Sequence, residues 1–274
     1  MSSTATSRIL DALAGRGKIT ASTLVVVAHP DDETVGMGAQ LSRFHDALLV
    51  QLTNGAPRDG RDAAMHGFGT IVEYAFARRV ELYTALAAGG AAGVATEIIG
   101  IPDQEVCFSL VALTELIAER LRSRATDAIF VLPYEGGHPD HDAASFAVWA
   151  ACRLIECEGG ARPPVIEMTS YHSEDSGLKT GAFLPSDIPV TTLALNSTER
   201  LRKRRMIDCF ASQRELLAAF GTEVELFRAA PDYDFAQPPP VGELYYERLG
   251  WRITGEIWRR EVRAALEAFG LRLQ

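Results

Sequence analysis

The sequence lacks the features of several common protein classes. Its four cysteines, Cys107, Cys152, Cys157 and Cys209, include no CxxC pair, which argues against a zinc ribbon and a thioredoxin-like redox site. No segment approaches the ~18 consecutive apolar residues of a membrane-spanning helix. The amino-terminal segment MSSTATSRILDALAGRGKIT has no long apolar stretch typical of a signal peptide. We therefore expect a cytoplasmic protein without integral membrane association.

The sequence also has no excess of positive charge. Its 27 basic and 36 acidic residues give a formal net charge of −9, which argues against general electrostatic binding of nucleic acid or an anionic membrane. The GxGxxG spacing of a phosphate-binding loop is absent around Gly36 and Gly38. Close helix packing is the better interpretation of these two glycines. We expect no nucleic-acid partner.

What the sequence does have is an alternation of apolar runs with helical spacing. The run LVVVA at Leu24–Ala28 is β-branched and continuous, as in a strand buried on both faces. Strands are expected at Leu24–Ala28, Ala47–Leu52, Thr96–Ile101 and Ala128–Leu132, and helices at about Glu33–Phe44, Tyr74–Ala88 and Leu110–Arg124. Such alternation implies parallel strands joined by right-handed crossovers. The sequence therefore predicts an α/β fold, a Rossmann-like three-layer sandwich with a mostly parallel sheet.

The alternation becomes less regular after about residue 163. Strands are expected at Val165–Tyr171 and Val190–Leu195, and a basic helix at Ser197–Ser212 with its charges in solvent. The proline-rich segment Pro231–Pro240 must be a loop. Since neither an internal repeat nor a clear linker is present, residues 1–274 are expected to form a single domain with a less regular carboxy-terminal part.

Two polar motifs follow two of the predicted strands. AHPDDE (Ala28–Glu33) and GGHPDHD (Gly136–Asp142) together hold three of the six histidines. In an open α/β sheet, ligands bind where loops converge at the carboxyl ends of the strands. Because both motifs follow strands of this kind, we expect them to meet in one cleft.

The residue types in the two motifs suit a hydrolytic metal centre. Imidazole and carboxylate are ligands that Zn²⁺ accepts, and a catalytic zinc commonly has three protein ligands. Zinc acidifies its bound water and polarises a carbonyl, while a free carboxylate and an imidazole can move protons or stabilise an oxyanion. Each motif alone could be an ordinary turn, but together they predict such a centre. The mixed N/O ligand set also suits other divalent transition metals.

The paired motifs resemble those of the LmbE/PIG-L family of N-acetylglucosaminyl deacetylases, with a looser likeness over about Leu24 to Ala150. The resemblance implies a Rossmann-like fold and a metal-dependent hydrolase that removes an N-acetyl or N-acyl group from an amino sugar or its glycoconjugate. Carried over by position, it implies that His29, Asp32 and His141 bind the metal and that Asp31 is the general base.

The resemblance implies further roles for four residues. His138 is similar to the family histidine that stabilises the tetrahedral intermediate and protonates the amine, and Asp140 would orient an imidazole. Arg79, in RVE, and Asp103, in GIPD, resemble the sugar-contacting arginine and acid of the family. The loop TNGAPRDGRDAAMHGF and the stretch beyond Arg162 depart from the family pattern, and both are expected to rim the cleft.

Two other classes of function are left open by the sequence. One is a metal hydrolase acting on another amide or on an ester; the other is a non-catalytic carbohydrate-binding relative. Asp31 and His138 argue against the second, because binding alone needs neither a base nor an oxyanion donor. Substrate identity, the acyl group, the native metal and the oligomeric state, including whether the chain forms an oligomer at all, stay open.

Overall fold

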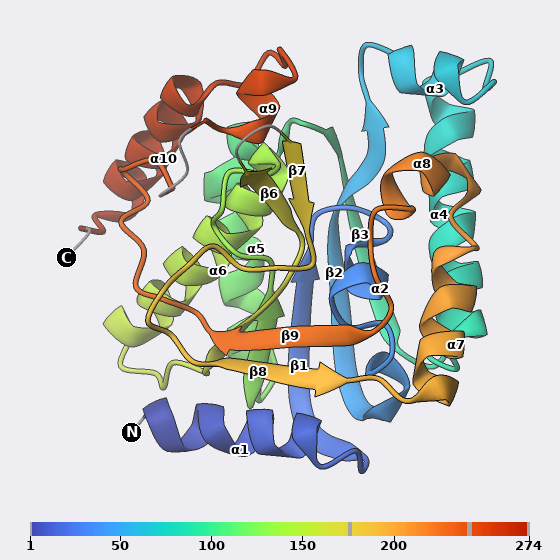
Figure 1. Ribbon diagram of the computed structural model, residues 1–274. Coiled ribbons are helices and arrows are strands. Elements are labelled where there is room, and N and C mark those ends of the chain that lie inside the picture. Colours follow the sequence, from blue (N-terminus) through green and yellow to red (C-terminus); the bar gives the residue numbers. More distant parts are fainter. Residues whose placement is uncertain (1, 175–176, 240–242, 273–274) are drawn as a thin grey trace.

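The computed structural model describes residues 2–174, 177–239 and 243–272 (Figure 1). Its centre is a seven-stranded sheet in the order β3-β2-β1-β4-β5-β9-β8. The strands are β1 (Ile19–Val27), β2 (Phe44–Pro57), β3 (Ala95–Asp103), β4 (Ala128–Val131), β5 (Val165–Met168), β8 (Val190–Ala194) and β9 (Val224–Ala229). The strands β1 to β5 run parallel, and β9 is antiparallel to both β5 and β8. A separate hairpin joins β6 (Tyr171–Glu174) to β7 (Gly177–Thr180). The predicted α/β class with a mostly parallel sheet is confirmed.

Helices cover both faces of this sheet and complete three layers. Figure 1 shows α5, α6 and α10 on one side and α4 and α7 on the other. The helices are α1 (Ser2–Ala14), α2 (Asp32–Met37), α3 (Arg61–Met65), α4 (Ile71–Ala88), α5 (Leu110–Ser123), α6 (Pro139–Cys157), α7 (Ser197–Ile207), α8 (Arg214–Leu217), α9 (Tyr245–Arg248) and α10 (Gly255–Phe269). Among the described residues, none of these helices is long and apolar enough to cross a bilayer.

The strand β1 explains why the layers hold together. Leu24 and Val26 pack into the core beneath α5, α6 and α10, whereas Val25 and Val27 pack into the core on the opposite face. All four side chains are fully buried, and full burial of such a side chain contributes about 1.5–3 kcal/mol. The β-branched run therefore sets a strand at the centre of the molecule, with its carboxyl end at the start of AHPDDE.

The helix predicted at about Glu33–Phe44 is shorter in the structure. The helix α2 ends at Met37, a 3₁₀ turn follows at Leu41–Arg43, and Phe44 already opens β2. At Ala39 the backbone N–H donates to the buried Glu225 carboxylate on β9 (2.9 Å), so it does not continue the helical bonding. A partner so distant in the chain has no local sequence signal.

The glycines of α2 are packing residues, as predicted. A Cβ added at Gly36 would lie 2.6 Å from the Sδ atom of Met168 on β5, and one at Gly38 would lie 2.5 Å from the carbonyl oxygen of Thr34. Both distances are shorter than carbon contacts in a packed interior. The missing side chain at Gly36 therefore lets α2 lie close to β5, whereas at Gly38, the residue after α2, it permits the close approach to the preceding helical turn.

One charged residue of the basic helix α7 is buried. Lys203 is only 2% exposed, and its Nζ donates to Glu225 (2.9 Å) and to the carbonyl of Val35 (2.7 Å). The prediction of a fully solvated charged face was wrong for this residue. The buried pair of Lys203 and Glu225 instead joins α7, α2 and β9.

We expect Lys203→Met to lower the free energy of unfolding by about 3–5 kcal/mol, since it leaves the Glu225 carboxylate buried without its cation. Arg204→Met, at the neighbouring exposed position, is the matched control and should change stability little. Chemical denaturation of both variants measures the difference. Equal stability of the two variants would show that the buried pair contributes nothing.

Candidate metal and active site

The two polar motifs lie side by side at the carboxyl edge of the sheet. The strands β1 and β4 are parallel neighbours, paired from Thr23 with Ala128 to Val26 with Val131. AHPDDE follows β1 and opens α2, and GGHPDHD follows β4 and opens α6. The expected meeting of the two motifs is therefore present in the structure.

Three buried side chains from these motifs point donor atoms at one position. His29 Nδ1 lies 3.1 Å from His141 Nε2 and 3.4 Å from Asp32 Oδ2, and His141 Nε2 lies 3.1 Å from Asp32 Oδ1. Zinc bonds of about 2.0–2.1 Å in a tetrahedron place neighbouring ligand atoms about 3.3 Å apart. The spacing of the three side chains thus fits a divalent metal of this kind, with one position left for another ligand.

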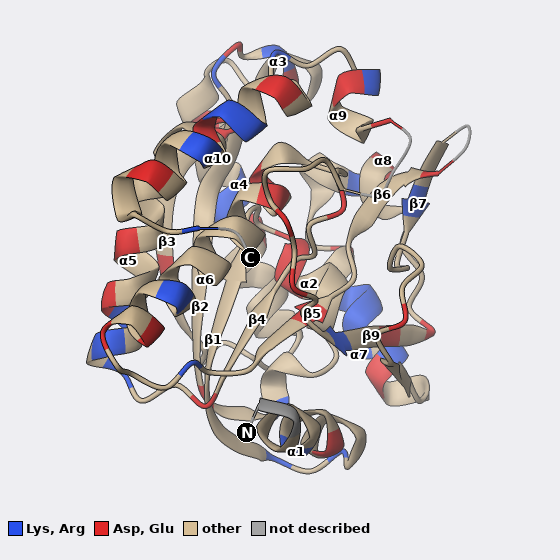
Figure 2. Cartoon of the chain, turned by 90° about the vertical axis from the view of Figure 1, so that its left-hand side faces the viewer, with Lys and Arg blue, Asp and Glu red and all other residues tan. Residues whose placement is uncertain are grey.

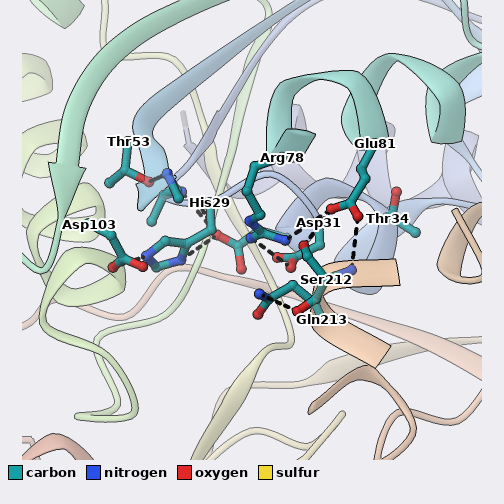
Figure 3. Close-up of polar contacts among 12 residues, drawn as sticks. His29, Asp31, Thr34, Thr53, Arg78, Glu81, Asp103, Ser212 and Gln213 are labelled. Carbon is teal, nitrogen blue, oxygen red and sulfur yellow. Dashed lines mark hydrogen bonds and ion pairs between the residues drawn. The ribbon is translucent and has the colours of Figure 1, made fainter. Parts of the chain in front are cut away.

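Each of these ligand candidates is held by its surroundings. The backbone N–H groups of Ala28 and His29 donate to Asp32 Oδ2 at 3.1 and 2.7 Å. His29 Nε2 faces Asp103 Oδ1 at 3.1 Å (Figure 3) and Asp140 Oδ2 at 3.6 Å, which favours a proton on Nε2 and a lone pair on Nδ1. The backbone N–H groups thus orient the Asp32 carboxylate, and the two carboxylates orient the His29 ring so that Nδ1 faces the proposed metal position.

The electrostatics of this cluster favour a cation. Burial opposes ionisation of Asp32, but the imidazoles of His141 and His29 outweigh it and hold the pKa of that carboxyl below its ordinary range. Burial also lowers the pKa of His29, yet Asp103 and the other nearby carboxylates raise it well above its ordinary value. Carboxylates that stabilise a proton on an imidazole would equally stabilise a metal cation in its place.

Asp31 stands beside this cluster in a strained conformation. Its φ of 141° lies outside the regions that non-glycine residues prefer. Arg78 Nη2 donates to Asp31 Oδ2 at 3.1 Å (Figure 3). Burial raises the pKa of Asp31 to about 6, although Arg78 acts in the opposite direction. A carboxylate with a pKa near neutrality suits a general base.

His138 lines the same cavity as the donor cluster and Asp31. The backbone N–H of Asp140 donates to its Nδ1 at 3.1 Å, and its Nε2 is 3.3 Å from Asp103 Oδ1. Burial, followed by the charge of His29, lowers the pKa of His138. These contacts favour a neutral imidazole that donates from Nε2.

Asp140 links the site to the segment after β3. Its two carboxylate oxygens accept the backbone N–H groups of Gln104 (2.7 Å) and Val106 (3.0 Å). It lies closer to His29 Nε2 (3.6 Å) than to His138 Nδ1 (4.0 Å). The carboxylate therefore holds the backbone that carries Asp103, and the imidazole it faces most closely is that of His29.

The structure does not bring Arg79 to the site. Arg79 is exposed, and its guanidinium lies 5.2 Å from the centre of the Phe76 ring on the outer face of α4. Arg78 takes the expected place: it is 2% exposed and lines the cavity beside Asp31. Its neighbours in the helical repeat, Tyr74 and Leu82, are also buried. This spacing of four residues was the sequence signal that distinguishes the two arginines.

The donor cluster opens into a cavity of about 210 Å³. Residues from beyond position 163 form part of its wall, among them Tyr171, Tyr245 and Trp251. The Tyr171 ring lies 5.2 Å from that of His141, and the Trp251 ring 4.8 Å from that of His138. The stretch beyond Arg162, which was expected to rim the cleft, thus contributes to its wall, although no motif points to these three aromatic residues.

Comparison with protein families finds a match in the amino-terminal part of the chain. The profile of the family described as PIG-L, GlcNAc-PI de-N-acetylase, matches residues 24–152. A comparison with curated proteins finds no match.

Several solved structures share the fold at low sequence identity. The zinc-inhibited form of teicoplanin deacetylase Orf2 has a TM-score of 0.56 at 17% identity, over 76% of this chain and 97% of that chain. N,N'-diacetylchitobiose deacetylase from Pyrococcus horikoshii has a TM-score of 0.52 at 16% identity, over 88% and 97%. GalB, the 4-carboxy-2-hydroxymuconate hydratase from Pseudomonas putida KT2440, has 0.53 at 20%, over 73% and 82%. Since the same fold includes a hydratase, the reaction has to be argued from the site.

Proposed function

We propose that this chain, whose residues 24–152 match the PIG-L family model, is a metal-dependent hydrolase that removes an N-acetyl or other N-acyl group from an amino sugar or its glycoconjugate. The observation that carries this proposal is the convergence of His29, Asp32 and His141 beside the Asp31 carboxylate. Deacetylases among the structural relatives support it. We also propose that residues 1–274 act as one domain, because side chains beyond residue 163 wall the cavity.

His29, Asp32 and His141 are the proposed metal ligands, and zinc is the proposed metal because two imidazoles and one carboxylate suit it. When bound, the metal would supply Lewis acidity that acidifies water and polarises the acyl carbonyl. Fe²⁺, Co²⁺ and Ni²⁺ suit the same N/O donors. Which of these ions the site binds would then depend on which metal is available to the protein.

The remaining groups of the site account for the proton transfers. Asp31 takes a proton from the attacking water and later delivers it to the departing amine, while Arg78 holds the carboxylate in place. His138, through its Nε2–H, stabilises the oxygen that becomes negative when the carbonyl is attacked. Asp103 holds His29 at its Nε2 atom and faces the Nε2 atom of His138 before substrate binds; the His138 N–H then turns from Asp103 to the acyl oxygen. We place Asp103 at the sugar as well.

We expect His29→Ala and His141→Ala to lose metal affinity. Each removes one of three ligands, so the loss should exceed the roughly 10–100-fold that removal of an outer partner of a ligand costs. Metal content after dialysis against a competing chelator measures it. His45→Ala, at an exposed position outside the site, is the control. Undiminished metal content in both site variants would remove these residues from the ligand set.

Release of acetate from the methyl glycoside of N-acetylglucosamine is the direct test of the proposed activity. Acetanilide and an acetate ester, offered in parallel, test the alternative of a hydrolase for other amides or esters. Preference for the sugar supports the proposal. Hydrolysis of the other compounds alone would favour that alternative, and sugar binding without any acetate would indicate a non-catalytic relative.

A further inference from the structure

A second, larger cavity adjoins the candidate active site. It measures about 560 Å³ and shares Asp62, Asp103, Gln104, Leu249 and Trp251 with the cavity that holds the donor cluster. The two spaces therefore lie next to each other along these residues. One wall of the larger cavity comes from the end of β2 to the start of α3 (residues 57–62), and another from residues 249–260. We call the larger cavity the outer groove.

The sizes of the two spaces suggest a division of roles. The inner cavity of about 210 Å³ is smaller than the roughly 300–1,000 Å³ of typical small-molecule sites. It has room for the acylated amine and the sugar ring next to it. A group attached to that sugar would reach the outer groove next, because the two spaces share Asp103 and Trp251.

One side of the outer groove is apolar. Phe108 is 53% exposed and Leu249 is 46% exposed, although both are large apolar side chains. Trp251, Ile253 and Ile257 line the same space. Apolar side chains that gather around a groove, with polar residues at its rim, mark binding sites. An apolar ligand group would cover this surface.

The charges of the outer groove are balanced. Its lining includes four arginines and four carboxylates: Arg58, Arg61, Arg252, Arg260, Asp59, Asp62, Asp103 and Glu105. Arg58 pairs with Glu105 (2.7 Å), Arg61 with Asp59 (3.4 Å) and Arg260 with Glu261 (2.7 Å). Figure 2 likewise shows acidic and basic residues interleaved on α3, α9 and α10. Three of the four arginines are thus paired, Arg252 being the exposed fourth, and a phosphate group in the groove would also meet four carboxylates.

We infer that the outer groove binds the neutral, apolar aglycone of a glycoside substrate. This inference rests on the proposed function and names its substrate class: an N-acylated amino sugar joined to an uncharged apolar group, in preference to a free sugar or a phosphate-linked one. Residues 249–260 lie outside the segment that the PIG-L profile matches. This wall of the groove is therefore outside the family pattern, whereas Phe108 lies inside it.

The test uses methyl, butyl and hexyl β-glycosides of N-acetylglucosamine, together with N-acetylglucosamine 1-phosphate. We expect kcat/KM to rise at least tenfold from the methyl to the hexyl glycoside, mainly through KM, since burying two methylene groups accounts for such a gain. The 1-phosphate should show no gain over the methyl glycoside. Equal kcat/KM for methyl and hexyl glycosides, or preference for the 1-phosphate, would overturn the inference.

Variants locate the effect in the outer groove. Phe108→Ala should reduce the ratio of kcat/KM for the hexyl over the methyl glycoside at least threefold, because it removes the most exposed apolar side chain of the groove. Val190→Ala is the matched control, since Val190 is an apolar side chain 44% exposed on the edge strand β8. A ratio unchanged in Phe108→Ala would place the aglycone elsewhere.

Binding of hexyl β-glucoside separates the groove from the reaction, because this compound has no acyl group to lose. Calorimetry should detect its binding, weaker in Phe108→Ala than in Val190→Ala. If the methyl glycoside is hydrolysed while hexyl β-glucoside does not bind, the groove inference fails and the proposed function stands. If hexyl β-glucoside binds in a Phe108-dependent way while no glycoside is hydrolysed, the proposed function fails and the groove stands.

Discussion

Removal of the divalent metal with a chelator should abolish acetate release, and addition of zinc should restore it. The expected loss is complete within detection, because Asp31 and His138 alone offer no Lewis acid to acidify water or polarise an amide. Activity is measured on the metal-free protein and again after each of Zn²⁺, Fe²⁺, Co²⁺ and Ni²⁺ is supplied at one equivalent. Circular dichroism on both forms controls for unfolding.

The result of metal removal tests the proposed metal ligands and, with them, the proposed hydrolase activity. His29 and Asp32 follow β1 and are held by backbone and carboxylate contacts, and His141 lies in the first turn of α6, so the fold should survive metal removal. Full hydrolysis by protein that contains no metal would contradict the assignment of His29, Asp32 and His141. Restoration by one metal alone would identify the native ion more sharply than the donor set does.

The second large effect is expected for Asp31→Asn. The amide cannot accept a proton from water, so turnover should fall ~10²–10⁴-fold, the range for loss of a general base. Metal content should stay near that of the unchanged protein, because Asp31 lies outside the group of converging donor atoms from His29, Asp32 and His141. Steady-state kinetics and metal analysis on the same preparation measure the two quantities.

The variant needs a matched control and a comparison. Asp11→Asn makes the same chemical change at an exposed position on α1 and should leave both quantities unaltered. His141→Ala provides the comparison for a lost ligand. If Asp31→Asn and His141→Ala lose metal equally, Asp31 is a ligand and the division of roles between Asp31 and Asp32 is mistaken.

The parts of this molecule that the sequence predicts are those that short segments determine. The run at Leu24–Ala28 is buried on both faces wherever it lies in a parallel sheet, so its strand follows from composition alone. The two histidine motifs follow directly after strands, and parallel neighbours bring such ends together. For the same reason the meeting of His29 with His141 was predictable without any knowledge of the intervening chain.

The parts that the sequence does not predict depend on distant partners. The early end of α2 follows from the contact of Ala39 with Glu225, and the burial of Lys203 depends on the same carboxylate. The aromatic wall of the cavity comes from Tyr171, Tyr245 and Trp251, which are positioned by packing rather than by a motif. Arg78 is an intermediate case, because the buried spacing of α4 does indicate it.

The wall around Trp251 has a consequence for how this protein can diverge. The residues that carry the proposed reaction lie in segments 29–32 and 138–141, whereas one side of the outer groove belongs to residues 249–260. Substitutions in that late stretch can alter which molecules enter without moving the atoms that would break the bond. Substitutions there can therefore change substrate preference at little cost to the reaction itself. Mutant libraries that aim to change the substrate of the protein should start with these residues.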